Sequence, residues 1–383
     1  MKHSYIAKRF QSSGAGLSLD TEALAKYKDI IDLSIGDTDF TTDESIINAA
    51  FRDAKAGHTH YGDPKGDPEL IDAVCRAWEE DFGQRLPRDH VLVSASSCLG
   101  MALVMLAILD PGDEVIVFSP YFPMYREQIE LAGGVCVDVP TYASEDYAID
   151  EARLRAAITP RTKAIVFNNP TNPTGMGYDG KTLELLARVA QEHDLLIAAD
   201  EIYTTYLYEG DFCPIRTLPG MAERTITLNS FSKNFLMTGW RVGVIIAEPE
   251  LLAVMNRVNG SLIYSAPSVS QRAALQALAM RKEIREKYVT AYRDRIFYAA
   301  DRIEKIPYLS LVRPKGTFYL FPGVEKTGLD EKAFCKVLLD QAHVLVSPGT
   351  PFGVSAAGHF RIACTVGIDR LKAAFDRMEK LSF

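Results

Sequence analysis

The sequence has no apolar run long enough to span a membrane. Its longest apolar stretch, residues 99–109, has eleven residues and includes a glycine, whereas a membrane-spanning helix needs about 20. Residues 1–13 contain no continuous apolar core like that of a secretory signal. We therefore expect neither a membrane anchor nor a secretory signal.

Cysteine is scarce and scattered, with no Cys-x-x-Cys pair. The six cysteines lie at positions 75, 98, 136, 213, 335 and 364. Zinc sites usually show closely paired cysteines, and small secreted domains usually show many disulfides. We expect neither a metal site nor a disulfide framework, and the pattern favours a reducing cytoplasm. His58 and His60 form the one close histidine pair, which we interpret as part of a polar loop.

Basic clusters are also missing. Lys and Arg total 42 against 50 Asp and Glu, so the net charge is −8. Nucleic-acid binders usually carry a basic stripe, so we expect neither a nucleic-acid nor a membrane partner. Apolar residues make up 47% and charged residues 24%, a balance typical of globular proteins. A chain of 383 residues suggests two or three domains.

Short apolar runs alternate with amphipathic stretches through the middle of the chain. Runs typical of buried strands lie at 91–94, 114–118, 135–139, 163–167, 195–199, 225–228 and 242–247. Helical patterns lie between many of them, at 99–109, 151–158 and 182–193. This alternation predicts an α/β fold with a mostly parallel sheet covered on both faces. Ligands bind such sheets at the carboxyl ends of the strands.

The last hundred residues have a different pattern, which predicts a smaller α+β domain. We expect a long helix at 283–306, strands at 309–312, 317–321, 344–347 and 360–364, and helices at 330–342 and from 369. The predicted large domain is 40–282, and the predicted small domain combines 1–39 with 283–383.

One segment matches a nucleotide-binding pattern. Residues 175–182, GMGYDGKT, satisfy GxxxxGK[ST], and Asp200 ends a later apolar run as a Walker B acid would. A phosphate-binding loop must follow its strand directly, so that backbone N–H groups meet the phosphate at a helix start. Here Pro170 and Pro173 intervene. We keep a P-loop nucleotidase as an alternative and favour an exposed Lys181 at a helix start.

A second polar group follows the predicted strand 225–228. It contains Ser230, Ser232 and Lys233, and Arg241 follows eight residues later. Two hydroxyls and a guanidinium suit a phosphate group. A lysine amine that is desolvated beside other cations has a lowered pKa and can form a Schiff base.

Together with other segments, these residues resemble the class I/II aminotransferases. These are pyridoxal-phosphate (PLP) enzymes of fold type I, in the aspartate aminotransferase superfamily. The matching segments are SFSK at 230–233, GWRVG at 239–243, NNPTNPTG at 168–175 and DEIY at 200–203. The resemblance covers nearly the whole chain. It implies a mostly parallel seven-stranded sheet with helices on both faces, a smaller α+β domain and PLP as cofactor.

The resemblance also assigns catalytic roles. Lys233 would hold PLP as a Schiff base and move a proton to and from the substrate Cα. Asp200 would pair with the pyridine nitrogen and keep it protonated. Asn172 and Tyr203 would donate hydrogen bonds to the phenolic oxygen of the ring.

Other residues would bind the cofactor's phosphate and ring. Backbone N–H groups of Ser96, Ser97 and Cys98 would meet the phosphate at a helix start, together with Ser230, Ser232 and Arg241. Phe122 would stack on the ring. The family often has a lysine where this chain has Cys98, and in some members that lysine contacts the distal carboxylate of aspartate. Cys98 therefore weakens an aspartate-specific interpretation.

The substrate and the partner subunit complete the predicted site. Arg361 would bind the substrate α-carboxylate bidentately, Gly36 would offer it a backbone N–H, and Asn172 would lie beside it. Tyr61 matches a family tyrosine that reaches the phosphate bound by the other subunit. This match implies a homodimer with shared active sites.

The predicted reaction is transamination between an α-amino acid and a 2-oxo acid. By family habit, glutamate and 2-oxoglutarate form one substrate pair, and the other amino acid is aspartate, aromatic or aliphatic. A PLP-dependent C–S β-lyase is the alternative that keeps the cofactor, because the same carbanion can expel a β-leaving group. The GWR segment at 239–241 resembles the transaminases more closely.

Overall fold

The computed structural model describes residues 5, 7 and 27–383. The predictions for residues 1–4, 6 and 8–26 lie outside the described residues. They include most of residues 1–13, where we expect no secretory signal.

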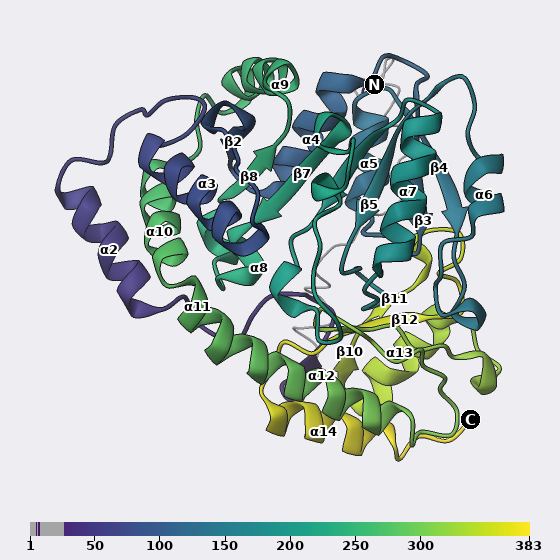
Figure 1. Cartoon of the computed structure of the whole chain (residues 1–383). Coiled ribbons are helices and arrows are strands. Elements are labelled where there is room, and N and C mark those ends of the chain that lie inside the picture. Colours follow the sequence, from purple (N-terminus) through teal and green to yellow (C-terminus); the bar gives the residue numbers. More distant parts are fainter. Residues whose placement is uncertain (1–4, 6, 8–26) are drawn as a thin grey trace.

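A seven-stranded sheet forms the centre of the fold, in the order β2-β8-β7-β6-β5-β3-β4 (Figure 1). Its strands are β2 (Val91–Ser94), β3 (Glu114–Ser119), β4 (Val135–Pro140), β5 (Thr162–Asn168), β6 (Leu196–Asp200), β7 (Thr225–Ser230) and β8 (Gly243–Ile246). Strand β8 runs antiparallel to its neighbours β2 and β7, and the other adjacent strands pair in parallel, so the predicted α/β class and mostly parallel sheet are confirmed.

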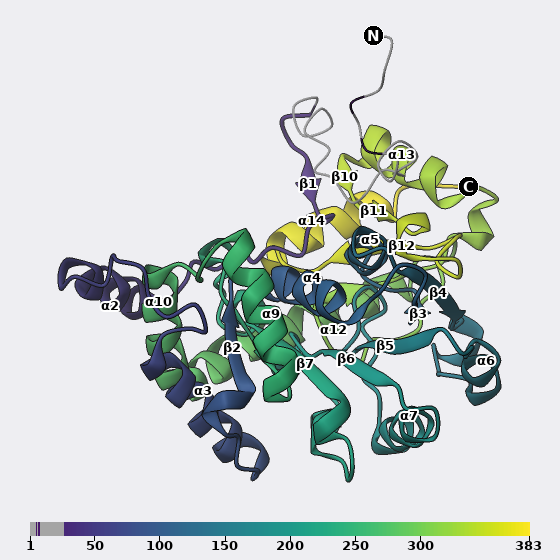
Figure 2. The same cartoon turned by 90° about the horizontal axis from the view of Figure 1, so that it is seen from above.

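Helices cover both faces of this sheet, because its strands are apolar on both sides. Alternate residues of β3 enter different cores: Val115 and Val117 enter one, Ile116 and Phe118 the other. The first core is closed by α4 (Ser97–Ile108), α5 (Met124–Leu131) and α9 (Pro249–Leu262), and the second by α6 (Glu151–Ala156) and α7 (Gly180–Glu192) (Figure 2). Burying one such aliphatic side chain contributes roughly 1.5–3 kcal/mol.

Three helices pack together beyond the β2 edge of the sheet (Figure 1). They are α2 (Glu44–Lys55), α3 (Pro68–Phe82) and α10 (Ser268–Ala279). Their apolar faces share a core with Val91 and Val93 of β2 and Val244 and Ile246 of β8.

The C-terminal part forms a separate core with a short N-terminal strand. Its strands are β1 (Ile31–Asp32), β9 (Tyr319–Leu320), β10 (Val344–Leu345), β11 (Ser347–Pro348) and β12 (Phe360–Ala363), and its helices are α12 (Thr290–Ile303), α13 (Glu331–Ala342) and α14 (Ile368–Met378). Strand β1 pairs in parallel with β10, and Ile31 and Leu33 pack against the helices. The predicted boundaries at residues 39/40 and 282/283 stay a prediction.

Three local predictions for this part need correction. Residues 309–312 form no strand: they lie between Pro307 and Pro314 and pair only through an isolated bridge from Ser310 to Gly323. The predicted strand 344–347 divides into β10 and β11, which join different sheets. The predicted helix 283–306 contains a π-helical turn, Arg285–Val289, between α11 (Arg281–Ile284) and α12. Among residues 27–383, no helix is long and apolar enough to cross a membrane.

Candidate active site

The register of the central sheet brings the predicted polar residues to one edge. Asn168 at the end of β5 lies opposite Asp200 at the end of β6. Ser230 at the end of β7 lies opposite Gly243, the first residue of the antiparallel β8, which also lies opposite Ser94 of β2. The carboxyl ends of the parallel strands therefore share one edge, as expected for a ligand site.

A cavity of about 1130 Å³ opens at this edge, between the central sheet and the C-terminal part. It is lined by every predicted site residue except Tyr61, namely Gly36, Ser96, Ser97, Cys98, Phe122, Asn172, Asp200, Tyr203, Ser230, Ser232, Lys233, Arg241 and Arg361. These residues come from sequence positions more than 300 apart, so the fold brings them together.

Lys233 lies on α8 (Phe231–Asn234), a single helical turn that follows β7 directly. Ser230 caps this turn, because its Oγ accepts a hydrogen bond from Ser232 N at 3.1 Å. Lys233 Nζ donates to the carbonyl oxygen of Gly36. The pKa of Lys233 is lowered to about 8, mainly by burial; Asp37 opposes this shift, and the nearby charges of Arg361 and Arg241 add to it.

Asp200 is a buried carboxylate with a free oxygen. Burial raises its pKa to about 6, although the hydrogen bond from the Tyr125 hydroxyl to Asp200 Oδ2 acts in the opposite direction. Among the described residues, Asp200 Oδ1 has no hydrogen-bond partner. An unpaired buried acceptor is costly, so it points to a ligand that donates a proton or hydrogen bond at this position.

The start of α4 forms an anion-binding corner. Ser96 has a left-handed backbone (φ +98°), and its Oγ accepts a hydrogen bond from Leu99 N at 3.2 Å. A Cβ on Gly243 would lie 2.7 Å from Ser97 N, so glycine lets β8 pack closely against this helix start. Arg241, which precedes Gly243 by two residues, also has a left-handed backbone (φ +55°) and donates to Thr238 O at 2.8 Å. Backbone N–H groups at a helix start and a guanidinium suit a phosphate.

Arg361 lies on β12 in the C-terminal part and also lines the cavity. Its Nη1 donates to Asn172 Oδ1 at 3.1 Å and its Nη2 to Ser34 O at 2.5 Å. Its guanidinium also lies 4.7 Å from the Tyr319 ring centroid. Within the described chain, Arg361 Nε is buried without a partner. A buried guanidinium with a free donor suits a carboxylate ligand.

Tyr319 explains why residue 36 is glycine. A Cβ on Gly36 would lie 1.8 Å from the Tyr319 hydroxyl oxygen, so no larger residue fits there. The same hydroxyl lies 3.1 Å from the hydroxyl of Tyr203. Tyr319 therefore contacts both Arg361 and Tyr203 directly.

Sequence reasoning missed Tyr125, Tyr319 and Gln128, which all line the cavity. Tyr125 and Gln128 follow Phe122 at helical spacing of three residues, a signal that places all three on one face of α5 and its preceding turn. Gln128 Nε2 donates to Cys98 O at 2.8 Å, which ties α5 to the start of α4. For Tyr319, which lies on a short strand more than 80 residues from Lys233, we find no comparable signal.

Tyr61 does not reach this cavity in its own chain. Its side chain is 87% exposed, and its ring makes an edge contact with Tyr264 at a centroid distance of 5.0 Å. This placement leaves Tyr61 available to another molecule.

The nucleotide-binding alternative does not fit the observed geometry. Asp179 caps α7, and its carboxylate accepts hydrogen bonds from Thr182 N at 3.0 Å and Thr182 Oγ1 at 2.9 Å. An acidic side chain thus holds the helix start and the hydroxyl that a phosphate and its metal ion would need. Lys181 is exposed and lies outside the cavity. In the described part of the chain, no three His, Cys, Asp or Glu side chains gather to hold a metal ion.

The cavity residues fit PLP, the cofactor that the resemblance implies. The free Oδ1 of Asp200 suits a protonated pyridine nitrogen. The start of α4, Ser230, Ser232 and Arg241 supply donors for a phosphate, and Lys233 supplies an amine whose pKa is lowered.

Comparison with known proteins gives the same assignment. A family model for aminotransferases of class I and II matches residues 28–378. The chain is 35% identical over 382 residues to the arginine–pyruvate transaminase of Pseudomonas aeruginosa, covering 99% of this chain and 97% of that protein. It is 38% identical over 385 residues to the aspartate/prephenate aminotransferase of Thermus thermophilus, covering 98% of each. A solved structure of Thermus thermophilus aspartate aminotransferase with maleate superposes with a TM-score of 0.93 at 35% identity, covering 99% of this chain and all of that one. The chain therefore belongs to the class I and II aminotransferases, and it is a PLP-dependent enzyme that catalyses transamination.

Proposed function

We propose that glutamate and 2-oxoglutarate form one substrate pair of this enzyme, and that the other amino acid is aspartate, aromatic or aliphatic. One observation carries the proposal: the Lys233 amine, the Asp200 carboxylate and the Arg361 guanidinium line one cavity. The names of relatives support the range of partners, since they include an aspartate/prephenate aminotransferase of Thermus thermophilus and an aromatic-amino-acid aminotransferase of Thermococcus litoralis.

The proposed catalytic residues hold and move protons. PLP, when bound, supplies an aldehyde that bonds to an amine and a ring that takes up the electron pair released at the substrate Cα. Lys233 Nζ, with a pKa of about 8, exchanges a proton near neutral pH and serves as general base and acid at Cα. Asp200 Oδ1 holds a proton at the ring nitrogen. Asn172 and Tyr203 would donate to the phenolic oxygen; because Asn172 Oδ1 accepts from Arg361, the amide nitrogen of Asn172 is left as the donor.

The remaining residues bind and orient. Phosphate would be held by the N–H groups at Ser96, Ser97 and Cys98, the hydroxyls of Ser230 and Ser232, and Arg241. Phe122 would pack on the ring face. Arg361, Gly36 and Asn172 would hold the substrate so that its Cα–H lies near Lys233, which supports catalysis through orientation.

We further propose a homodimer in which Tyr61 reaches the partner's phosphate site. Several apolar side chains near Tyr61 are exposed: Leu262 by 54%, Ile263 by 39% and Tyr264 by 46%. An exposed apolar patch of this kind is typical of a protein interface. Sedimentation at micromolar concentration tests this, and a monomer with full activity would contradict it.

A cytoplasmic location is also part of the proposal. All six cysteines are free, and Cys98 lies exposed in the cavity. Free thiols persist in a reducing compartment.

A donor screen tests the substrate proposal. Purified holoenzyme is incubated with 2-oxoglutarate and single amino acids, and glutamate formation is measured. We expect turnover with at least one acidic, aromatic or aliphatic donor, and none for Lys233→Ala. The matched control is Lys181→Ala, which removes an exposed lysine outside the cavity and should keep wild-type turnover.

Two outcomes contradict the proposal. If no donor changes the absorption of the bound cofactor, the substrate class is wrong. If cysteine or cystathionine releases pyruvate and ammonia faster than any donor yields glutamate, the main reaction is β-elimination.

A further inference from the structure

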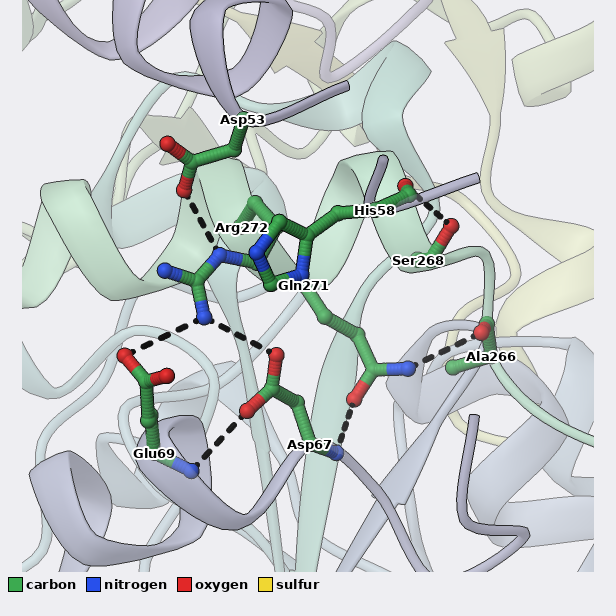
Figure 3. Close-up of polar contacts among 8 residues, drawn as sticks. All are labelled: Asp53, His58, Asp67, Glu69, Ala266, Ser268, Gln271 and Arg272. Carbon is green, nitrogen blue, oxygen red and sulfur yellow. Dashed lines mark hydrogen bonds and ion pairs between the residues drawn. The ribbon is translucent and has the colours of Figure 1, made fainter. Parts of the chain in front are cut away.

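The loop that carries Tyr61 is held at both ends by α10. Residues 56–67 connect α2 to α3. On α10, Ser268 contacts the beginning of this loop, Gln271 contacts its end, and Arg272 reaches both the last turn of α2 and the end of the loop (Figure 3). Gln271 and Arg272 follow Ser268 by three and four residues, so each lies next to Ser268 on the helix surface.

At the beginning of the loop, α10 contacts the last turn of α2 and the backbone that follows it. Arg272 Nε donates to Asp53 Oδ2 at 2.7 Å, and Ser268 Oγ donates to the carbonyl oxygen of His58 at 2.9 Å. These bonds hold the chain three residues before Tyr61.

At the end of the loop, α10 holds the residue that caps α3. Arg272 Nη1 lies 3.1 Å from Asp67 Oδ2 and 3.2 Å from Glu69 Oε2. The amide of Asp67 donates to Gln271 Oε1 at 2.6 Å, and Asp67 Oδ1 accepts from Glu69 N at 2.9 Å. The cap of α3 and the end of the loop therefore depend on the same contacts with α10.

Arg272 links the two ends through a largely buried pair of carboxylates. Its side chain is 10% exposed, against 21% for Asp53 and 19% for Asp67. Charge-assisted bonds with this geometry are stronger than neutral ones, and they need the planar fork of arginine because different nitrogens serve the two carboxylates.

Between these anchors, Lys65 also contacts β2, because its carbonyl oxygen accepts a hydrogen bond from Val93 N at 2.9 Å. Tyr61 is 87% exposed, and its ring contact is with Tyr264, which lies just before α10. The ring of Tyr61 and both ends of its loop therefore contact one segment, residues 264–272. If the bonds from Arg272 to Asp53 and Asp67 were lost, the loop could shift, and Tyr61 would move relative to the rest of the subunit.

We propose that Arg272 is a positioning residue for a contact between subunits: it bridges Asp53 and Asp67 so that Tyr61 is held ready for the phosphate bound by the partner. This inference rests on the proposed shared active site. It predicts that Arg272 acts on the partner's cavity and not on the cavity of its own chain.

Mixed dimers test this prediction directly. In each dimer one chain carries Lys233→Ala, so that borohydride fixes the cofactor only at the lysine of the other chain. In the first dimer, the Lys233→Ala chain is paired with an Arg272→Lys chain. In the second, a wild-type chain is paired with a chain that carries both substitutions. The cofactor dissociation constant is measured by borohydride fixation at graded PLP concentrations.

The two dimers have opposite expected results. In the first, the remaining lysine site receives an intact loop, so its affinity should equal that of a Lys233→Ala/wild-type dimer. In the second, the site receives the altered loop, and we expect cofactor affinity to fall about threefold to tenfold. This is less than the effect of losing a hydrogen bond to a charged group completely, because the loop is displaced and Tyr61 is still present. The inference would be overturned if cofactor affinity fell in the first dimer, where Arg272→Lys lies in the same chain as the remaining lysine. It would also be overturned if affinity fell in neither dimer.

A double-mutant cycle separates this inference from the proposed function. In homodimers that keep Tyr61, we expect Arg272→Lys to weaken cofactor binding. In homodimers that already carry Tyr61→Phe, adding Arg272→Lys should change cofactor affinity by less than about twofold, because the effects of coupled residues are not additive. Additive effects would overturn the inference alone. No effect of Tyr61→Phe would overturn the shared site and the inference with it.

Two further variants guard against a purely structural effect. Arg281→Lys is the matched control, since Arg281 pairs with Glu80 and with Asp81 at 3.4 Å on α3, away from the loop. It should leave cofactor affinity unchanged in every dimer. If Arg272→Lys fails to fold, Ser268→Ala removes only the bond to the His58 carbonyl and should show the same dependence on the partner chain; its failure to do so would also overturn the inference.

Discussion

Replacing Asp200 with asparagine should stabilise the cofactor-free protein as pH rises, while turnover is lost. Burial raises the pKa of Asp200 from 3.8 to about 6. A difference of about two pKa units corresponds to roughly 3 kcal/mol of folding free energy, lost when the carboxyl ionises inside the protein. Asp200 is only 7% exposed, so solvent screens little of this cost. The enzyme thus carries a destabilising charge at the position where function needs it.

The sign of the effect follows from the raised pKa. A carboxyl of this kind contributes its stability below the pKa of the unfolded chain, near 4, and that contribution is lost as pH rises through about 6. Asparagine has no such titration. Its buried amide nitrogen costs about 1–3 kcal/mol if it finds no partner, but that cost does not change with pH. Between pH 5 and pH 8, the stability of Asp200→Asn should therefore rise relative to wild type by about 1.5 kcal/mol.

Urea unfolding of the two cofactor-free proteins measures this difference. Both proteins are compared at one protein concentration and at several pH values, so that the other titrating groups cancel. Asp194→Asn is the matched control, because the Asp194 side chain is 96% exposed and is not desolvated. A difference between Asp200→Asn and wild type that stays constant from pH 5 to pH 8 would refute the reasoning.

Three further predictions concern the same cavity. Tyr125→Phe removes the hydroxyl that donates to Asp200, so the pKa of Asp200 should rise further and the stability transition should move to higher pH in the same urea series. Covalent attachment of PLP to Lys233 should speed up as pH rises toward about 8, because only the neutral amine is nucleophilic; borohydride trapping between pH 6 and pH 9 measures the rate, and a flat profile would contradict the lowered pKa. Arg361→Lys keeps the charge but loses the bidentate fork, so the KM for glutamate should rise about tenfold or more, with stability within about 1 kcal/mol of wild type by thermal unfolding.

Much of the site was predictable because its residues sit at strand ends. Asp200 ends β6, and Ser230 and Lys233 end β7 or follow it, so a parallel sheet must bring them to one edge. The apolar runs that predicted the strands are continuous, since both faces of the sheet are covered. The same reasoning failed for residues 309–312, where an apolar run between two prolines gains no neighbouring strand.

The order of strands and helices, the polar residues at the strand ends and the family resemblance were all determined by the sequence alone, because burial periodicity and local motifs act over short distances. Tertiary structure decided which distant side chains meet. Arg361 bonds to Asn172 across 189 residues, and the Tyr319 hydroxyl leaves no room for a side chain at Gly36. The bridge from Arg272 to the loop of Tyr61 likewise joins segments about 200 residues apart. No local pattern encodes such contacts, since they depend on how complete helices and strands pack against one another.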